Sequence, residues 1–185
     1  MRVYEKPSAE NTAPTLTLAI DKAKELSCDI ILSTTSGASA LTALAMAKDA
    51  EFTGKLIVIT HVYGMREPGM NSLSDDDRQT LEDGGVAVVT AGHAFGGIER
   101  AISGKYSGVY PVEIMAQTLK MLSAGVKVCV EIGAMALDAG KAAHDRPSVV
   151  IGGTGRGLDT VCVMTPGYSS KIFDTKIHEI LCKPY

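Results

Sequence analysis

The chain has 185 residues, of which 45% are hydrophobic and 21% are charged, and its formal net charge at pH 7 is −3. These values are typical of an ordinary globular protein, and we expect one domain over residues 1–185 with a full core. The chain has no stripe of Lys and Arg, which argues against a nucleic-acid surface. It also has no apolar run of membrane-spanning length, which argues against a membrane protein, and no apolar signal-peptide core. These features together predict a cytoplasmic location.

Helix and strand patterns alternate through the first half of the chain. Thr12 and Pro14 indicate the start of a helix, whose apolar residues recur at helical spacing up to Leu26. The elements predicted after it are a strand over 29–33, a helix over 38–50, an apolar strand over 55–60, a polar loop over 61–73, a helix over 74–83 that begins with a serine and three aspartates, and a strand over 86–90.

The second half continues the alternation after a glycine-rich crossing segment. The predicted elements are this crossing segment over 91–110, a helix from Pro111 to a stop at Gly125, strands over 148–151 and 160–164 around a glycine loop over 152–157, and a last β-prone stretch over 177–182. Residues 126–140 fit a strand by the alternation of Val126, Val128 and Val130, or a helix that ends at Gly140. We favour the helix for most of this segment.

Alternating strands and helices predict an α/β fold with a mostly parallel, doubly wound sheet. In such sheets ligands bind beyond the carboxyl ends of the strands, at the point where the strand order reverses. We therefore expect the loops after the first, second and fourth predicted strands to form one site.

The loop after the first strand has the sequence Ser33-Thr34-Thr35-Ser36-Gly37-Ala38-Ser39, which combines hydroxyls, a glycine and a helix start. Backbone N–H groups at a helix start have no acceptor within the helix, and together with the helix dipole they attract anions. The sequence therefore predicts a phosphate-binding loop made of Thr34, Thr35, Ser36, Gly37, Ala38 and Ser39. The alternative is an ordinary capped helix start with a serine-rich turn.

The loop after the second strand supplies the candidate binding residues Thr60, His61 and Arg66. This loop borders the phosphate-binding loop in the predicted topology, so we expect His61 or Arg66 to contact a bound ligand. The alternative is a solvated loop in which Arg66 and Glu67 hold the backbone in place.

The glycine loop after the fourth strand supplies Gly153, Gly155 and Arg156. Its glycines allow the backbone to approach a ligand closely, and Arg156 adds a cation. The alternative is a tight reversal between two antiparallel strands, with Arg156 exposed. A strand rather than a helix follows the G-x-G pattern, so we do not expect a dinucleotide site of the Rossmann type.

The other histidines carry weaker signals. His93 forms a further polar group with Glu99 and Arg100 in the crossing segment. His144 and His178 show no ligand spacing, and we expect them at the surface. No arrangement of residues along the chain predicts a metal site or identifies a catalytic residue.

The cysteines are predicted to be reduced core thiols. None of the four lies at the two-residue spacing that zinc or redox motifs need, and each lies in or beside an apolar segment. They are Cys28, Cys129, Cys162 and Cys182.

The segment from Asn11 to about Pro166 resembles the C-terminal α/β domain of pyruvate kinases. The loop over 34–39 is similar to the threonine-x-serine-glycine-x-serine loop that binds an effector sugar phosphate there. Residues 108–112 and 153–161 are similar to the glycine-aromatic-proline helix start and to the last glycine loop with its returning strand. The whole chain resembles more closely a group of stand-alone archaeal and bacterial proteins, through residues 10–12, 61–69 and 129–132.

This resemblance implies a three-layer α/β/α fold with strand order 3-2-1-4-5, in which the fifth strand is antiparallel. It also implies a ligand that carries a phosphate, with FMN as a candidate, and a homo-oligomer. Two departures matter. Thr35 and Ala38 stand where pyruvate kinases carry basic residues, which favours a phosphate monoester over a bisphosphate. The length leaves no room for a kinase barrel of about 250 residues beside this domain, so we expect no phosphoryl transfer from phosphoenolpyruvate.

Three hypotheses on function follow. The favoured one is a binding protein for a phosphorylated small ligand, a mononucleotide such as FMN. The second is an enzyme, flavin-dependent or not, that acts on a small metabolite through His61, Arg66 or His93. The third is a regulatory or interaction module that has lost the ligand, for which we expect an occluded phosphate-binding loop and a large apolar patch.

Overall fold

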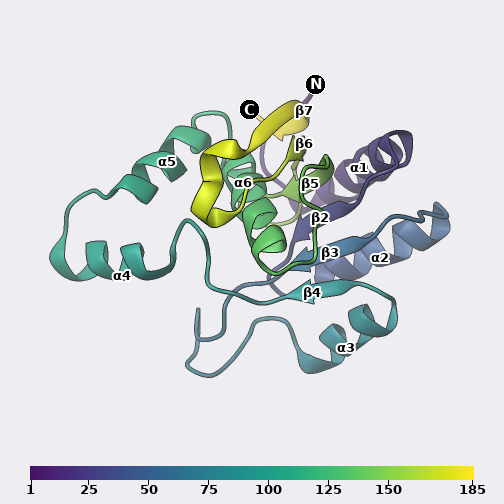
Figure 1. The fold of residues 1–185 in the computed structure, drawn as a ribbon. Coiled ribbons are helices and arrows are strands. Elements are labelled where there is room, and N and C mark those ends of the chain that lie inside the picture. The colour runs from purple at the N-terminus through teal and green to yellow at the C-terminus, as the bar shows by residue number, and fades with distance from the viewer.

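A sheet of seven strands forms the centre of the computed structural model, which describes residues 1–185 (Figure 1). The strands are β1 (Arg2–Tyr4), β2 (Ile30–Ser33), β3 (Leu56–Ile59), β4 (Ala87–Val89), β5 (Ser148–Gly152), β6 (Thr160–Thr165) and β7 (Lys176–Pro184). The helices are α1 (Thr12–Leu26), α2 (Ala38–Asp49), α3 (Asp75–Asp83), α4 (Gly97–Tyr106), α5 (Pro111–Lys120) and α6 (Ala124–Asp138), with the 3₁₀ helices η1 (Ala9–Asn11) and η2 (Ser169–Asp174).

The strands lie in the order β1-β7-β6-β5-β2-β3-β4. β5, β2, β3 and β4 are parallel, whereas β6 is antiparallel to both β5 and β7. The predicted α/β class is confirmed. The five strands that the resemblance implied follow one another as β4-β3-β2-β5-β6. The expectation that the sheet has only five strands is wrong, because β7 pairs with β6 and β1 pairs with β7. The sheet is therefore wider than expected and contains both parallel and antiparallel pairs.

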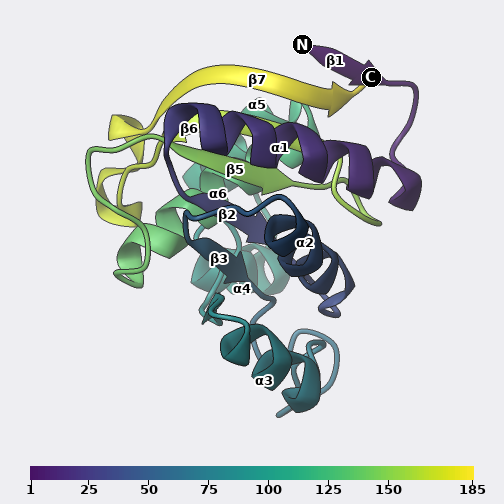
Figure 2. The same cartoon turned by 90° about the vertical axis from the view of Figure 1, so that its right-hand side faces the viewer.

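Helices cover both faces of the sheet because each buried strand presents alternate residues to opposite sides. Ile30 and Leu32 of β2 pack in one apolar cluster with Leu16 of α1 and Leu44 of α2. Ile31 packs in a second cluster, which contains residues of α5 and α6. Figure 2 shows α1 and α2 on the side of the sheet that faces the viewer.

The segment after α5 is helical, as favoured from the sequence. Ser123 caps α6, since its Oγ accepts a hydrogen bond from the backbone N–H of Val126 at 3.0 Å. The expected helix stop at Gly125 is therefore wrong. Gly125 lies in the first turn of α6, where a Cβ atom would stand 2.0 Å from the Oγ1 of Thr160. The glycine allows α6 to lie close against the sheet.

The crossing segment contains a helix that the sequence did not predict. No residue of α4 is buried, and the side chains of Ile98 and Tyr106 are exposed. Its apolar residues Ile98, Ala101, Ile102 and Tyr106 do recur at helical spacing, but Gly97 and Gly104 are poor helix formers and hid this short helix within a glycine-rich segment. β1 was also missed, because three residues are too few for a pattern. None of the helices has both the length and the apolar character that crossing a membrane requires.

The carboxyl ends of β2, β3, β4 and β5 lie at one edge of the sheet because these strands are parallel. The loops over residues 34–37, 60–74, 90–96 and 153–159 leave the sheet at this edge. Three of them are the loops from which the sequence predicted a site.

Candidate functional site

A pocket of about 1140 Å³ lies at this edge of the sheet, between the strand ends, the first turns of α1 and α2, and the middle of α6. Eleven of the twelve predicted site residues line it: Thr34, Thr35, Ser36, Ala38, Ser39, Thr60, His61, Arg66, Gly153, Gly155 and Arg156. The twelfth, Gly37, does not line the pocket, but its backbone conformation determines the turn of the loop. The predicted topology thus brought together the loops that the structure places around one cavity.

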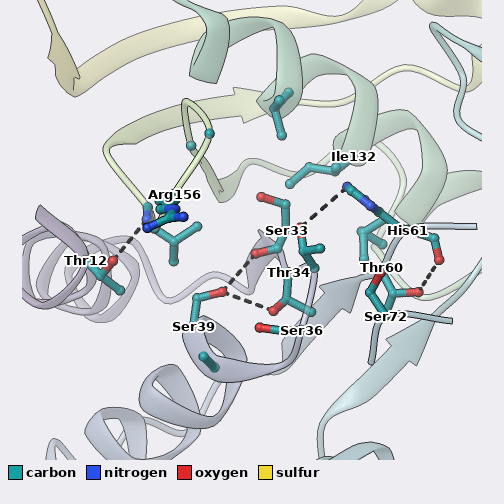
Figure 3. A pocket seen from close by; sticks show the side chains of 18 of the residues that line it. Thr12, Ser33, Thr34, Ser36, Ser39, Thr60, His61, Ser72, Ile132 and Arg156 are labelled. Atoms are coloured by element: carbon teal, nitrogen blue, oxygen red, sulfur yellow. Dashed lines mark hydrogen bonds between the residues drawn. The ribbon is translucent and has the colours of Figure 1, made fainter. Parts of the chain in front are cut away.

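The loop over residues 34–39 is held from inside by Thr34, which is 5% exposed. The Oγ1 atom of Thr34 accepts a hydrogen bond from the backbone N–H of Gly37 at 3.1 Å. It accepts a second one from the Oγ of Ser39, also at 3.1 Å (Figure 3). Gly37 has a φ of 94°, a left-handed conformation, and a Cβ atom there would lie 2.7 Å from a side-chain carbon of Leu73. Both facts require glycine at this position.

The same loop leaves backbone donors without partners. The N–H groups of Ser36, Ala38 and Ser39 donate to no acceptor within the protein, and Ser36 and Ala38 are exposed. They lie at the N-terminus of α2, which has no side-chain cap. A turn of unpaired donors at the positive end of a helix dipole is suited to bind an anion.

The glycine loop makes a tight reversal between β5 and the antiparallel β6, as one of the two interpretations of its sequence expected. Asp159, which is fully buried, accepts hydrogen bonds from the backbone N–H of Thr154 at 2.9 Å and from the hydroxyl of Thr160 at 2.8 Å. Thr12 of α1 accepts the N–H of Leu158 at 3.1 Å and ties the loop to that helix. The reversal therefore holds Arg156 at the pocket.

The loop after β3 is held by Asn71. Its side-chain nitrogen donates to the carbonyl of His61 at 2.8 Å, and its side-chain oxygen accepts the N–H of Leu73 at 2.9 Å. The alternative in which Arg66 and Glu67 hold this backbone is wrong, because neither side chain takes part in a hydrogen bond or ion pair. Arg66 lines the pocket with an unpaired, exposed guanidinium.

Two imidazoles lie side by side in the pocket. The ring centroids of His61 and His93 are 5.4 Å apart in an edge-to-face arrangement. The Nε2 atom of His61 is 3.5 Å from the Oγ1 of Thr35, and its Nδ1 is buried without a hydrogen-bond partner. Burial lowers the pKa of both rings, and His93 further lowers the pKa of His61.

A buried carboxylate supports this pair from α6. Glu131 is 4% exposed, and its Oε1 accepts the backbone N–H of Phe95 at 2.8 Å, which fixes the loop that carries His93. Its Oε2 accepts a hydrogen bond from the Nζ of Lys127 at 2.6 Å, so its charge is paired. Glu131 also acts on the pKa values of His61 and His93, which it raises against the effect of burial.

Residues 14–164 match the family model described as "Pyruvate kinase, alpha/beta domain". The chain belongs to this family. The match includes β2 through β6 and therefore all three predicted loops of the pocket. Of the pocket lining, only residues of η1 and the first turn of α1 precede the matched range in this pyruvate kinase α/β domain.

Sequence reasoning missed Glu131 as a pocket residue and gave His93 a minor role. A signal for Glu131 was present, because it is a lone carboxylate in the middle of a strongly apolar helix. The grouping of His93 with Glu99 and Arg100 is wrong in part. The carboxylate of Glu99 accepts the N–H of Glu113 at 3.2 Å and faces the start of α5, outside the pocket.

The remaining predictions on histidine and cysteine hold. His144 and His178 are exposed and lie outside the pocket. All four cysteines are free thiols, three of them buried and Cys28 partly buried. Burial raises the pKa values of Cys129 and Cys182, which keeps these thiols protonated and unreactive.

Proposed function

We propose that this pyruvate kinase α/β domain binds a phosphorylated small ligand, and that the phosphate lies on the loop over residues 34–39. The observation that carries the proposal is the set of unpaired N–H donors of Ser36, Ala38 and Ser39, which open into a pocket that also holds two unpaired cations. Backbone donors and cations that converge without internal partners are the arrangement that a phosphate monoester needs.

Arg156 and Arg66 take the place of the basic residues that the loop itself lacks. Both guanidiniums are exposed, line the pocket and belong to no ion pair. A hydrogen bond to a charged group contributes about 1.5–3 kcal/mol. They approach the pocket from two different loops, so a ligand can engage the cations while its phosphate rests on the backbone donors.

The pocket has room and surface for more than a phosphate. Its volume of about 1140 Å³ lies above the usual range for small-molecule sites, roughly 300–1,000 Å³. Val128, Ile132 and Met135 of α6 supply apolar lining. An apolar wall beside an anion-binding loop suits a flat ring joined to a phosphate, and for this reason we propose a mononucleotide such as FMN as the ligand class.

The visible absorption spectrum of the purified protein, followed by mass analysis of what denaturation releases, tests the ligand class. We expect a flavin spectrum and released FMN. Release of a sugar phosphate would replace FMN by another phosphorylated ligand and keep the anion site. A protein that releases nothing and binds neither added FMN nor inorganic phosphate would contradict the proposal.

The Ser36→Asp variant tests the loop. A carboxylate at this position stands where the anion is expected and repels it, so affinity for FMN should fall at least about tenfold, which is about 1.4 kcal/mol. The control is Ser170→Asp, which adds the same charge to an exposed position of η2 outside the pocket. Equal retention of FMN by the two variants would remove the loop from the proposal.

A second candidate function is an enzyme that acts on a phosphorylated metabolite. The observation that favours it is the pairing of His61 and His93 inside the pocket, since imidazoles with lowered pKa values can accept protons at neutral pH. A screen of phosphorylated metabolites, with and without added FMN, should then find a turnover that His61→Ala abolishes. A turnover unchanged in this variant would leave the histidines without a catalytic role.

The interaction-module hypothesis receives less support. The occluded loop that it predicts is not found, because Ser36 and Ala38 are exposed at the pocket. This hypothesis also predicts exposed apolar surface, and apolar side chains are exposed on α4 and α5, outside the pocket.

A further inference from the structure

The two imidazoles of the pocket lie next to the anion-binding loop. The Nε2 of His61 is 3.5 Å from the Oγ1 of Thr35, which belongs to that loop, and the ring of His93 lies behind it at a centroid distance of 5.4 Å. Both histidines line the same cavity as Ser36 and Ser39. A phosphate group held by the loop therefore lies close to the ring of His61.

The ring of His61 is incompletely satisfied within the protein. Its Nδ1 is buried and has no hydrogen-bond partner, although nearly all buried polar atoms in proteins have one. Its Nε2 makes only the long contact with Thr35. An imidazole held in this way has no internal partner that settles which nitrogen carries a proton, so an external group can decide it.

The charges that face the two rings come from four elements. His61 faces His93, Arg66 from its own loop, and Glu131 of α6. His93 faces Glu131 and Lys127 of α6 and Arg100 of α4. Burial, the neighbouring imidazole and the cations all disfavour a positive charge on the pair, and Glu131 alone favours it. The carboxylate of Glu131 is itself paired with Lys127, which weakens its effect.

We propose that one proton enters the His61–His93 pair when a doubly charged phosphate or sulfate group binds at the loop over residues 34–39. Anion binding and protonation of the pair then strengthen each other. This inference rests on the proposed function and adds to it a form of regulation: the site holds its ligand more tightly at lower pH. The proton comes from solvent and adds to an imidazole nitrogen, so no other reactant is needed.

The physical reason is that a bound anion changes the charges around a protonated imidazole. Without an anion, a proton on either ring meets cations and a second imidazole in a partly buried site. With an anion, the same proton lies beside two negative charges, and the Nε2–H of His61 can donate to an anion oxygen. Linkage requires the converse, so that a protonated pair raises anion affinity by the same factor. Uptake of one proton makes affinity rise by up to about tenfold for each pH unit.

Sulfate is the sharpest probe, because it keeps two negative charges throughout this range, whereas a phosphate monoester titrates near pH 6 itself. We expect the affinity of the protein for sulfate to rise at least about tenfold between pH 8 and pH 5.5. Calorimetry in two buffers of different ionisation enthalpy should show proton uptake on binding. FMN and inorganic phosphate serve as parallel probes.

Three variants separate the roles of the histidines. His61→Gln should remove most of the proton uptake and hold the change in sulfate affinity over this range below about twofold. His93→Gln should keep the pH dependence and move its midpoint to higher pH, because His61 no longer faces a second imidazole. The control, His178→Gln, alters an exposed histidine on β7 whose partner is Thr165, and should match the unaltered protein.

The histidine resonances give an independent readout by NMR. Sulfate should raise the titration midpoint of His61, assigned through His61→Gln, and leave the positions of the His178 resonances unchanged. Sulfate, phosphate or FMN binding that is independent of pH and releases or takes up no proton would overturn this inference and leave the proposed function in place. Absence of binding by all three probes at every pH would overturn both. Unchanged pH-dependent binding in Ser36→Asp would place the anion away from the loop and overturn this inference as well.

Discussion

The β2–α2 junction and the α4–α5 segment both contain a turn with a glycine, but they differ in how many of their residues are buried against the rest of the protein. Ile31 and Leu32 of β2 are completely buried, and α2 buries Ala40, Ala43, Leu44 and Ala47. α4 buries no residue, and Ile98 is 82% exposed. The loop over residues 34–39 thus extends directly from the core, whereas α4 projects from it (Figure 1).

This difference shows how the pocket is positioned. The loop over residues 34–37 is a short link between two elements that pack for reasons of their own, so its backbone donors are held in place by β2 and α2. Within the α4–α5 segment, α5 packs against the core through the buried side chain of Ala116, whereas α4 is tied to α5 by Ser103, whose hydroxyl donates to Glu113 at 2.7 Å. It is joined to the pocket through the preceding loop, where Glu131 anchors Phe95.

Amide hydrogen exchange should reveal the largest contrast. Eleven of the fifteen residues of α6 are buried, so we expect its central amides to exchange only through global unfolding. The amides of α4 should exchange at least about a thousandfold faster, since local opening of an exposed helix costs little. Comparable protection of α4 and α6 would mean that another surface covers α4 in solution.

Matched isoleucine truncations should give the next largest effect. Ile31→Ala removes a fully buried side chain between β2 and α6 and should lower the free energy of unfolding by about 2–5 kcal/mol. Ile98→Ala, on α4, should change it by less than about 0.5 kcal/mol. Chemical denaturation of both variants measures this. Similar losses would contradict the contrast between the two regions.

Removing one cation from each region should change the affinity for a ligand in one case and not in the other. Arg156→Ala should weaken affinity for FMN by about tenfold or more and flatten its salt dependence, because a cation is lost from the pocket. Lys105→Ala removes an exposed cation from α4 and should leave affinity unchanged. An affinity equal in both variants would return the glycine loop to a purely structural role.

The pH dependence of stability should be the smallest effect. The pKa values of His61 and His93 in the folded protein lie below the ordinary value of 6.5, so the unfolded chain binds more protons as the pH falls below that value. Stability without ligand should therefore decline from pH 7 toward pH 5, and His61→Gln should flatten this decline. Thermal unfolding across the pH series measures it. A melting temperature that rises toward pH 5 would contradict the assignment.

Much of the fold and of the site geometry could be predicted where a pattern has one physical cause. Apolar strands alternating with helices predicted the class, and the strand ends predicted which loops meet. α4 was missed because Gly97 and Gly104 lower its helix propensity within a glycine-rich segment, and β1 was missed because three residues are too few for a pattern. The stop expected at Gly125 failed for another reason: this glycine serves close packing of α6 against Thr160, a purpose that sequence spacing does not reveal.

The sequence by itself determined the α/β class and the loops that would lie around one pocket, and its resemblance to the pyruvate kinase α/β domain determined the family. Periodicity is sufficient for the class, because the apolar pattern of a buried strand or of a helix depends on near neighbours. Only the tertiary structure decided that His61, His93 and Glu131 meet, since they lie on three segments that pack together through the sheet. Their electrostatic coupling is a property of that packing, because it depends on burial and on distances between residues far apart in the chain.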